Sequence, residues 1–431
     1  MKIARNIILL FLGISLSQCK SFVDGVNVNP NQFTDAPPEL IIGQVEIAVV
    51  MLNESQPARF AGIFTDQFTG FDRQFLAYDS YNVISGDFDD TWTNIYSSGI
   101  AQARIVQEKA DKNLVLKGRA QIMEAILAGE ATALYGDVPY VQSCKPLEFP
   151  NPKYDAQKDV LAAVQTLLDQ AIQNVGTTTA SGALFTASNA TWAEIAHTLK
   201  ARYYLIAKDY ANARTQALIG ISKVNGGLHS LHTDVTGQKN LFYQFGIEQR
   251  GGYMTVTRSH LRKLITGERA RLLATPGDAN RGEVYFDREE LNYFDNGYFA
   301  VNAPFPIVNW YENQLILAEA QARTGNTTAA VTAFNNVRDR LAVVYGGSFP
   351  RTTATGDLLI RHILEEKYVT MIGSLQVYHD IRRTANAIGI PVKLSTSKLI
   401  PQRFIYPQVE KNANTSFPGF VDIFVQTPVN K

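Results

Sequence analysis

Aromatic side chains gather in two stretches of the sequence that also carry amides, carboxylates and glycines. The first runs from Phe60 to Trp92 and the second from Tyr285 to Phe299. A sugar presents apolar ring faces edged by hydroxyl groups, so an uncharged aromatic platform with amides and carboxylates nearby suits it. The residues that we expect to contact such a ligand are Phe71, Asp72, Arg73, Gln74, Tyr78, Tyr81, Asn292, Tyr293 and Tyr298.

The alternative for many of these rings is a place in the hydrophobic core. Large aromatic side chains are mostly buried in folded proteins. For that reason we expect Trp92, Trp192 and Trp310, each of which opens a helical stretch, to lie in the core. For the tyrosines, whose neighbours are polar or glycine, the pattern leaves both interpretations open.

Patterns for catalysis and for metal binding are weak. His229 and His232 lack a third ligand at a recognisable spacing. The acidic residues Asp87, Asp89 and Asp90 lack the spacing of an EF-hand, and capping of the helix that follows is the simpler prediction. No GxSxG, HExxH, P-loop or GxGxxG sequence occurs. We therefore predict a protein that is not an enzyme and needs no cofactor, and a hydrolase ranks below a binding protein.

Composition bounds the class of protein. The chain has 431 residues, of which 45% are hydrophobic and 19% charged, as in a folded protein with a large core. Its 40 basic and 40 acidic residues leave no net charge. A nucleic-acid-binding protein needs a basic field, so nucleic acid is not an expected partner.

The first residues are typical of an export signal. Lys2 and Arg5 precede an apolar stretch of 11 residues, Ile7 to Ser17, which is too short to span a bilayer. Cys19 follows, and the arrangement resembles the lipobox of bacterial lipoproteins, although Gln18 replaces the usual small residue. We expect residues 1–18 to be a signal peptide, Cys19 to be lipidated and residues 19–38 to be a polar tether. An ordinary secretory peptide is the alternative.

The aromatic stretches must be positioned by a helical scaffold. Residues 310–344 form two amphipathic helices with small residues at their contact, joined at Gly325-Asn326. Residues 191–224 repeat the design, as in tetratricopeptide hairpins. The fold class predicted is mainly α, with residues 39–431 as a single domain. Irregular, aromatic-rich insertions near 60–92 and 226–306 are expected to bind the ligand, with one helix, Leu261 to Leu273, inside the second.

Short motifs near the C-terminus resemble those of one family. The segments are ILEEKY within Leu358–Ile372, DIRRT within Gln376–Thr384 and IPQRFIYPQ within Leu399–Asn414, with LYGDVPY earlier, at Leu134–Tyr140. Together they resemble the SusD/RagB family of outer-membrane nutrient-binding lipoproteins of Bacteroidetes. We expect Arg382, Arg383 and Arg403 in these motifs to make structural contacts, with Glu365 or Glu366 as ion-pair partners.

The resemblance implies a function. Family members have a helical body with tetratricopeptide-like hairpins and cover a SusC-type TonB-dependent transporter in the outer membrane. They capture oligosaccharides, and peptides in some members, without catalysis. The expected location is the outer membrane, lipid-anchored and facing the cell exterior, although a periplasmic orientation stays open. A helical-repeat scaffold lipoprotein that docks protein partners without a soluble ligand is the alternative.

Overall fold

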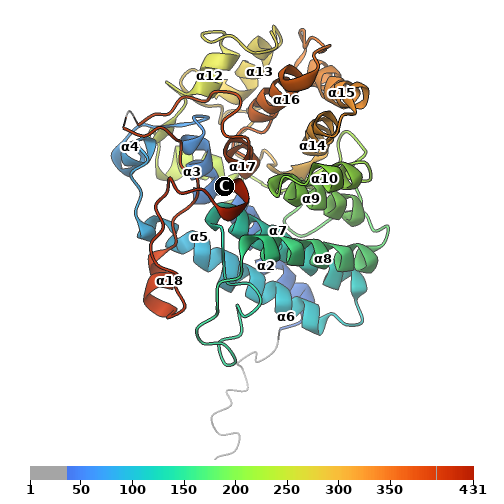
Figure 1. Ribbon diagram of the computed structural model, residues 1–431, viewed down its shortest axis with the longest axis vertical. Helices are drawn as coiled ribbons and strands as arrows, with labels where there is room; N and C mark the ends of the chain where they lie inside the picture. Colours follow the sequence, from blue (N-terminus) through green and yellow to red (C-terminus); the bar gives the residue numbers. More distant parts are fainter. Residues whose placement is uncertain (1–35, 395) are drawn as a thin grey trace, which may run out of the picture.

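Helical hairpins form one half of the molecule, as the sequence predicts (Figure 1). The computed structural model describes residues 36–394 and 396–431. The hairpins are α7 (Leu114–Tyr135) with α8 (Gln157–Val175), α9 (Trp192–Ile206) with α10 (Tyr210–Ala217), and α14 (Trp310–Arg323) with α15 (Thr327–Tyr345). In turn, α8 packs on α9, α10 packs on α14, and α14 packs on α16 (Gly356–Thr370). The mainly α, tetratricopeptide-like fold class is confirmed.

The hairpin of α14 and α15 shows how the sequence specifies these units. The side chain of Asn309 accepts a hydrogen bond from the Glu312 amide and starts α14. Gly325 has φ +82°, a conformation that glycine adopts without strain, so α14 can end in a tight turn. Asn326 holds the N-cap position of α15, but its amide donates to Thr324 instead of capping the helix. Helix α15 therefore begins without a side-chain cap.

Within the described residues, the other half contains short helices and three two-stranded antiparallel sheets. The pairs are β1 (Thr69–Gly70) with β3 (Met254–Thr255), β2 (Gly227–His229) with β6 (Pro306–Asn309), and β4 (Phe286–Asp287) with β5 (Glu290–Leu291). The remaining helices are α2 (Pro38–Glu54), α3 (Gln56–Phe64), α4 (Arg73–Asp79), η1 (Ser85–Phe88), α5 (Asp89–Thr93), η2 (Asn94–Ile100), α6 (Ala101–Lys109), α11 (Leu241–Tyr243), η3 (Gln244–Gln249), α12 (His260–Ile265), α13 (Asp278–Tyr285), α17 (Leu375–Arg383), α18 (Gln408–Ala413) and η4 (Pro428–Asn430).

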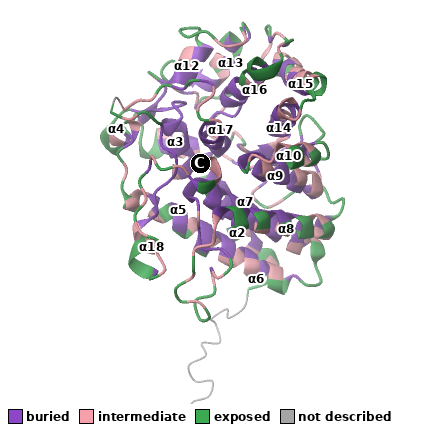
Figure 2. Ribbon diagram, in the orientation of Figure 1, coloured by how far each residue is buried: buried purple, intermediate pink, exposed green. Residues whose placement is uncertain are grey.

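Buried apolar side chains join both halves in one contiguous cluster that extends from Ile42 to Ile423. Figure 2 shows that α7 and α17, at the centre of the view, are almost entirely buried. Trp92, Trp192 and Trp310 are all buried, so their assignment to the core is confirmed.

The predicted helix Leu261 to Leu273 is shorter than expected. Helix α12 ends at Ile265, and Gly267 follows with φ +79°. Beyond it the chain turns toward α16, where the Leu272 amide and the Arg271 side chain both donate to Glu365 (2.9 Å each). The buried contacts of Arg271 and Leu272 with Glu365 therefore outweigh the helix propensity of this segment, and the helix ends earlier than the sequence predicts.

The arginine partners also differ from the prediction. Glu366 binds Arg271, Arg281 and Arg338, three arginines outside the motifs. Arg383 instead pairs with Glu319 of α14, and Arg382 donates to the carbonyls of Ala133 and Gln402. Arg382 and Arg383 have the structural role that was expected. The carboxylates expected to pair with them bind other arginines instead.

The C-terminal segment returns to the end of α7. Phe404 donates its amide to the Leu134 carbonyl (2.9 Å), and the Arg403 side chain donates to the Tyr135 carbonyl. Near the last residue, the Val429 amide donates to the side chain of Gln157 in α8 (3.0 Å). In Figure 1 the C-terminus accordingly lies at the centre of the view, beside α7 and α17.

The signal peptide, Cys19 and nearly all of the tether lie outside the described residues. Within residues 36–394 and 396–431, none of the helices has the length and apolar character needed to cross a membrane.

Candidate ligand-binding cleft

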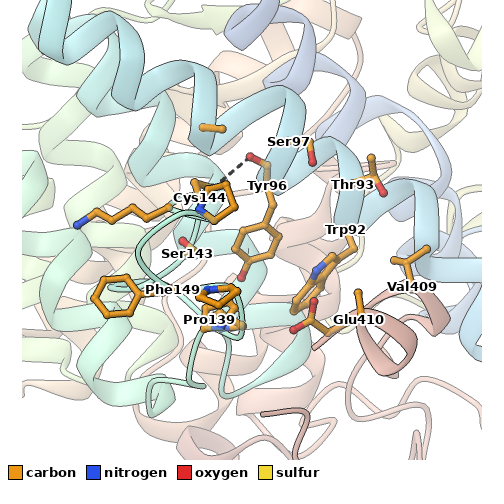
Figure 3. A pocket seen from close by; sticks show the side chains of 16 residues that line it. Trp92, Thr93, Tyr96, Ser97, Pro139, Ser143, Cys144, Phe149, Val409 and Glu410 are labelled. Carbon is orange, nitrogen blue, oxygen red and sulfur yellow. Dashed lines mark hydrogen bonds between the residues drawn. The ribbon is translucent and has the colours of Figure 1, made fainter. Parts of the chain in front are cut away.

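A cleft of about 590 Å³ opens beside α5, where three distant segments of the chain meet (Figure 3). One wall is formed by α5 and η2, the second by the loop that follows α7, and the third by α18. The lining residues are Trp92, Thr93, Tyr96, Ser97, Ala101, Pro139, Ser143, Cys144, Lys145, Pro146, Phe149, Pro150, Pro152, Val409, Glu410 and Ala413. A concave, mostly apolar surface of this size is typical of a small-molecule site.

Polar groups on this surface have unused hydrogen-bonding capacity. The hydroxyl groups of Thr93 and Ser97 are on exposed residues and make no hydrogen bond with the part of the chain that the structure describes. Lys145 is likewise exposed and has no ion-pair partner there. These groups are available to a ligand.

Glu410 provides a carboxylate in a fixed orientation. Its Oε1 accepts hydrogen bonds from the Tyr154 hydroxyl (3.0 Å) and from Asn414 Nδ2 (2.7 Å). Asn414 is anchored in turn, because its Nδ2 also donates to the Pro152 carbonyl (2.9 Å). Oε2 has no partner among the described residues, so one carboxylate oxygen is free to accept hydrogen bonds from hydroxyl or amine groups.

The wall that carries Tyr96 is an unusual helix. Residues Asn94–Ile100 form a π-helix, a rare geometry that occurs often at functional sites. Gly99 lies within it, and a Cβ atom there would be 2.5 Å from the Leu127 side chain. The small residue thus lets the widened turn pack directly on α7. The π-helix and α5 together place Trp92, Thr93 and Ser97 along one wall.

Tyr96 contributes its ring to this wall, but its hydroxyl group has no hydrogen-bond partner among the residues that the structure describes. The side chain is buried, and Figure 3 shows it pointing from η2 toward the loop that carries Pro139 and Phe149. Burial raises the pKa of the phenol well above its ordinary value, with a smaller contribution from Glu410, so Tyr96 stays neutral.

None of the nine residues expected from the sequence to bind a ligand lines this cleft. Phe71, Asp72, Arg73 and Gln74 are exposed at the start of α4. Asp72 caps that helix by accepting from the Arg73 amide (2.8 Å). The Phe71 amide donates to the Tyr253 carbonyl (2.8 Å), which fixes this group beside β3. Whether these four residues contact a ligand stays a prediction.

The predicted tyrosines lie deeper. Tyr78 of α4 and Tyr81, two residues after that helix, are both buried. Tyr78 donates to Asp87 (2.7 Å), and Tyr81 accepts from the Lys393 amide (3.0 Å). Tyr293 is buried beside η3, and Tyr298 is half-buried against Tyr285. Asn292 uses its side-chain amide in structural contacts, because Nδ2 donates to the Glu283 carbonyl of α13 (2.8 Å) and Oδ1 accepts from the Phe294 amide (3.0 Å). Their role in ligand binding also stays a prediction.

The acidic residues near Trp92 have roles other than the one expected. Asp87 accepts from the Ile84 amide (2.8 Å), and Asp89 accepts from the Val409 amide (3.0 Å). No side chain caps α5. Asp89 therefore fixes α18 in place as the third wall of the cleft. Within the described residues, no group of three or more His, Cys, Asp or Glu side chains is placed to hold a metal ion.

Sequence reasoning missed the cleft because its walls are separated by up to about 300 residues of sequence. One signal was present: four prolines, Pro139, Pro146, Pro150 and Pro152, occur within a short loop after α7. Proline fixes φ and stiffens a loop, so such a run indicates a rigid surface.

Comparison with known proteins shows the fold and a similarity to one family. A family model described as SusD-like, "Starch-binding associating with outer membrane", matches residues 30–238. The match covers just under half of the chain, and over that part the chain is similar to this family. No curated protein matches its sequence at a significant level.

Solved structures share the SusD-like fold over nearly the whole chain. A SusD/RagB family protein from Bacteroides thetaiotaomicron has 19% identity and a TM-score of 0.64, covering 89% of this chain and 95% of that one. A SusD superfamily protein from Bacteroides fragilis has 19% identity and a TM-score of 0.67, covering 90% and 100%. A chitin-binding protein has 19% identity and a TM-score of 0.67, covering 91% and 100%. At such identities the likeness shows the fold. The matching family is described by a binding role, starch binding, in agreement with the prediction of a binding protein.

Proposed function

We propose that this SusD-like protein binds an oligosaccharide nutrient in the cleft beside α5 and delivers it to a SusC-type TonB-dependent transporter in the outer membrane. The observation that carries the proposal is the combination of apolar walls with uncommitted polar groups in one cleft. Phe149 and the prolines offer apolar surface to the face of a sugar ring. Thr93, Ser97 and Glu410 offer hydrogen-bonding groups to its hydroxyl edge.

Two comparisons support a sugar in preference to a peptide. The matching family is described as starch-binding, and one protein of the same fold is described as chitin-binding. The cleft also combines features that suit a neutral sugar, because Glu410 can accept from two neighbouring hydroxyls while an apolar ring face packs on the wall.

The cell-surface part of the proposal rests on the sequence. Lipidation of Cys19 would anchor the chain, and residues 19–38 would tether the folded body to the outer membrane. The family description, association with the outer membrane, supports this location. The direct test is fractionation of cells that express the wild-type chain or Cys19→Ala. The variant is expected to leave the membrane fraction, and retention there would contradict lipid anchoring.

Ligand binding is tested by calorimetric titration of the purified protein with maltooligosaccharides and with chitooligosaccharides of matched length. Saturable binding of either series without release of smaller sugars supports a binding protein. Lack of binding by both series, together with binding of an oligopeptide library, would overturn the sugar assignment.

The transporter partner is tested separately by affinity purification from detergent-solubilised outer membranes. Recovery of a TonB-dependent transporter supports delivery to that partner. Recovery of other proteins alone, together with absence of any soluble ligand, would favour the alternative of a scaffold lipoprotein.

A further inference from the structure

Among the described residues that line the cleft beside α5, only two carry a charge, and the two charges are opposite in sign. Glu410 lies on α18 and Lys145 on the loop after α7, and neither has an ion-pair partner in the described chain. Their formal charges cancel. A charged ligand is attracted by one of these groups and repelled by the other, so the cleft suits a neutral ligand with strong hydrogen-bonding groups of its own.

The Glu410 carboxylate has one oxygen left for such a ligand. Oε1 already accepts from Tyr154 and Asn414, whereas Oε2 has no partner among the described residues and is open to solvent. A carboxylate oxygen accepts shorter and stronger hydrogen bonds than a neutral acceptor does. Oε2 therefore favours a ligand that presents an N–H or O–H group to α18.

A hydrogen-bond donor is present on the adjacent wall, at Trp92. Its indole nitrogen makes no hydrogen bond with the part of the chain that the structure describes, and it is open to solvent although the side chain as a whole is only 5% exposed. The ring is fixed by Tyr96 and Tyr135, whose centroids lie 4.7 and 5.1 Å from it. Figure 3 shows the Trp92 ring and the Glu410 side chain on the same side of the cleft, where α5 contacts α18. A fixed donor and a fixed acceptor thus come from two separate elements.

Apolar side chains lie next to the carboxylate on α18. Val409 and Ala413 are one helical turn apart, line the cleft and are exposed. The Val409 amide donates to Asp89 of α5 (3.0 Å), so this apolar surface is held at a fixed distance from the helix that carries Trp92. A methyl group of a ligand would cover this surface, whereas a hydroxyl group would not.

We propose that the cleft selects 2-acetamido sugars, an inference that rests on the proposed oligosaccharide-binding function and names the class of sugar. The acetamido group is neutral and planar, and its N–H and C=O bonds are directed to opposite sides. The N–H donates to Glu410 Oε2, and the carbonyl oxygen accepts from the Trp92 indole N–H. The methyl group packs on Val409 and Ala413. A sugar with a hydroxyl group at the same carbon leaves this apolar surface uncovered and has no second polar atom to bridge donor and acceptor.

The test is calorimetric titration of the purified full chain with chitotriose and with cellotriose. These two sugars have the same linkage and differ only in the acetamido or hydroxyl group at C2 of each unit. Chitotriose is expected to bind about tenfold more tightly than cellotriose, or better. The glucosamine trimer, in which an amine replaces each acetamido group, should bind more weakly than chitotriose. Tighter binding of this cationic trimer than of chitotriose would overturn the assignment.

Variants of the two proposed partners should reduce the selectivity. Trp92→Phe keeps an aromatic ring and removes the N–H group, whereas Glu410→Gln removes the charge that strengthens the hydrogen bond. Each should lower the ratio of the affinities for chitotriose and cellotriose by about threefold or more. Lys411→Gln is the matched control and should leave the ratio unchanged, because Lys411 follows Glu410 in α18 but is exposed and does not line the cleft. If Trp92→Phe is poorly folded, Glu410→Gln decides.

The outcomes separate this inference from the proposed function. Equal affinity for chitotriose and cellotriose would overturn the selection of acetamido sugars and leave oligosaccharide binding in place. An affinity ratio that is unchanged in both partner variants would do the same for the assigned contacts. Lack of binding of chitotriose, cellotriose and maltotriose alike would overturn the proposed function, and this inference with it.

Discussion

Arg383 of α17 and Glu319 of α14 form a fully buried, two-bond ion pair. Arg383 Nη1 donates to Glu319 Oε1 (2.7 Å) and Nη2 donates to Oε2 (2.5 Å), and Asp380 accepts from the same guanidinium. Both side chains are almost fully removed from solvent. The pair therefore joins the DIRRT motif to the hairpin that the sequence marks most clearly, and it links segments 64 residues apart.

Breaking this pair is expected to destabilise the protein strongly. Glu319→Gln leaves Arg383 buried with only Asp380 as an acidic partner, and such a loss costs about 3 to 5 kcal/mol of unfolding free energy. Urea unfolding followed by circular dichroism measures the change. Asp339→Asn is the control, because Asp339 pairs with Arg351 at the surface and should cost less than about 1 kcal/mol. Equal losses of unfolding free energy in the two variants would contradict a stabilising role for the buried pair of Arg383 and Glu319.

Acid should destabilise the protein through the same carboxylate. Arg383 and Arg323 lower the pKa of Glu319 from 4.5 to about 2, against the opposing effect of burial. A carboxyl group whose pKa is lowered in the folded state contributes stability that is present above its unfolded pKa and lost as the pH falls through the folded value. Unfolding free energy should therefore decline between about pH 4.5 and pH 2. Unfolding free energy should fall less steeply with pH in Glu319→Gln than in the wild type. Equal slopes would show that Glu319 does not contribute to the pH dependence of stability.

Two helix glycines should respond to alanine in opposite ways. A Cβ atom at Gly129 in α7 would lie 2.3 Å from the Tyr203 ring, which is itself fully buried. Gly129→Ala should therefore cost about 1 to 3 kcal/mol through overpacking. Gly43 in α2 has no atom within 4 Å of the same position, so Gly43→Ala should stabilise the protein by about 0.5 to 1 kcal/mol. Thermal unfolding of both variants measures the difference.

In the cleft, loss of the carboxylate or of the aromatic wall should weaken sugar binding without unfolding the protein. Glu410→Gln keeps an acceptor for Tyr154 but removes the charge, and the expected loss of affinity is about tenfold. Phe149→Ala removes a half-buried ring and should cost about 0.5 to 1.5 kcal/mol of binding free energy. Calorimetric titration with the oligosaccharide that binds the wild type measures both.

Tyr96→Phe is the matched control for these two variants. It removes a hydroxyl group that has no partner and keeps the ring that lines the wall. Its thermal stability should equal or exceed that of the wild type, and its affinity for the sugar should change less than twofold. A large loss of affinity would show that the ligand reaches this oxygen and that the wall moves on binding.

Much of the scaffold could be predicted because its signals are local. Gly325 and Asp209 each mark a helix–helix turn, and Thr191 with Glu194 forms the capping box that starts α9. Apolar periodicity and caps act over a few residues, so they can be read along the chain. The predicted length of the helix at α12 was wrong, because Glu365, about 100 residues away, binds the segment that follows α12.

The candidate site depended on long-range packing and could not be predicted in the same way. Trp92 was correctly placed in the core, but nothing local shows that its neighbours Thr93 and Ser97 face Val409 and Glu410 across a cleft. Conversely, the local mixture of aromatic and polar residues around Tyr78 gives no indication that its hydroxyl is satisfied internally by Asp87. Residue type indicates what a side chain can do, whereas accessibility is set by partners far along the chain.

The return of the C-terminal segment to α7 has a consequence for the order of folding. The Leu134 carbonyl and Gln157 Oε1 accept hydrogen bonds from the amides of Phe404 and Val429, which lie about 270 residues later in the chain. Contacts between the two ends of a long chain form slowly, because a large loop must close first. We therefore expect the packing of the C-terminal segment on α7 and α8 to be among the later contacts to form during folding.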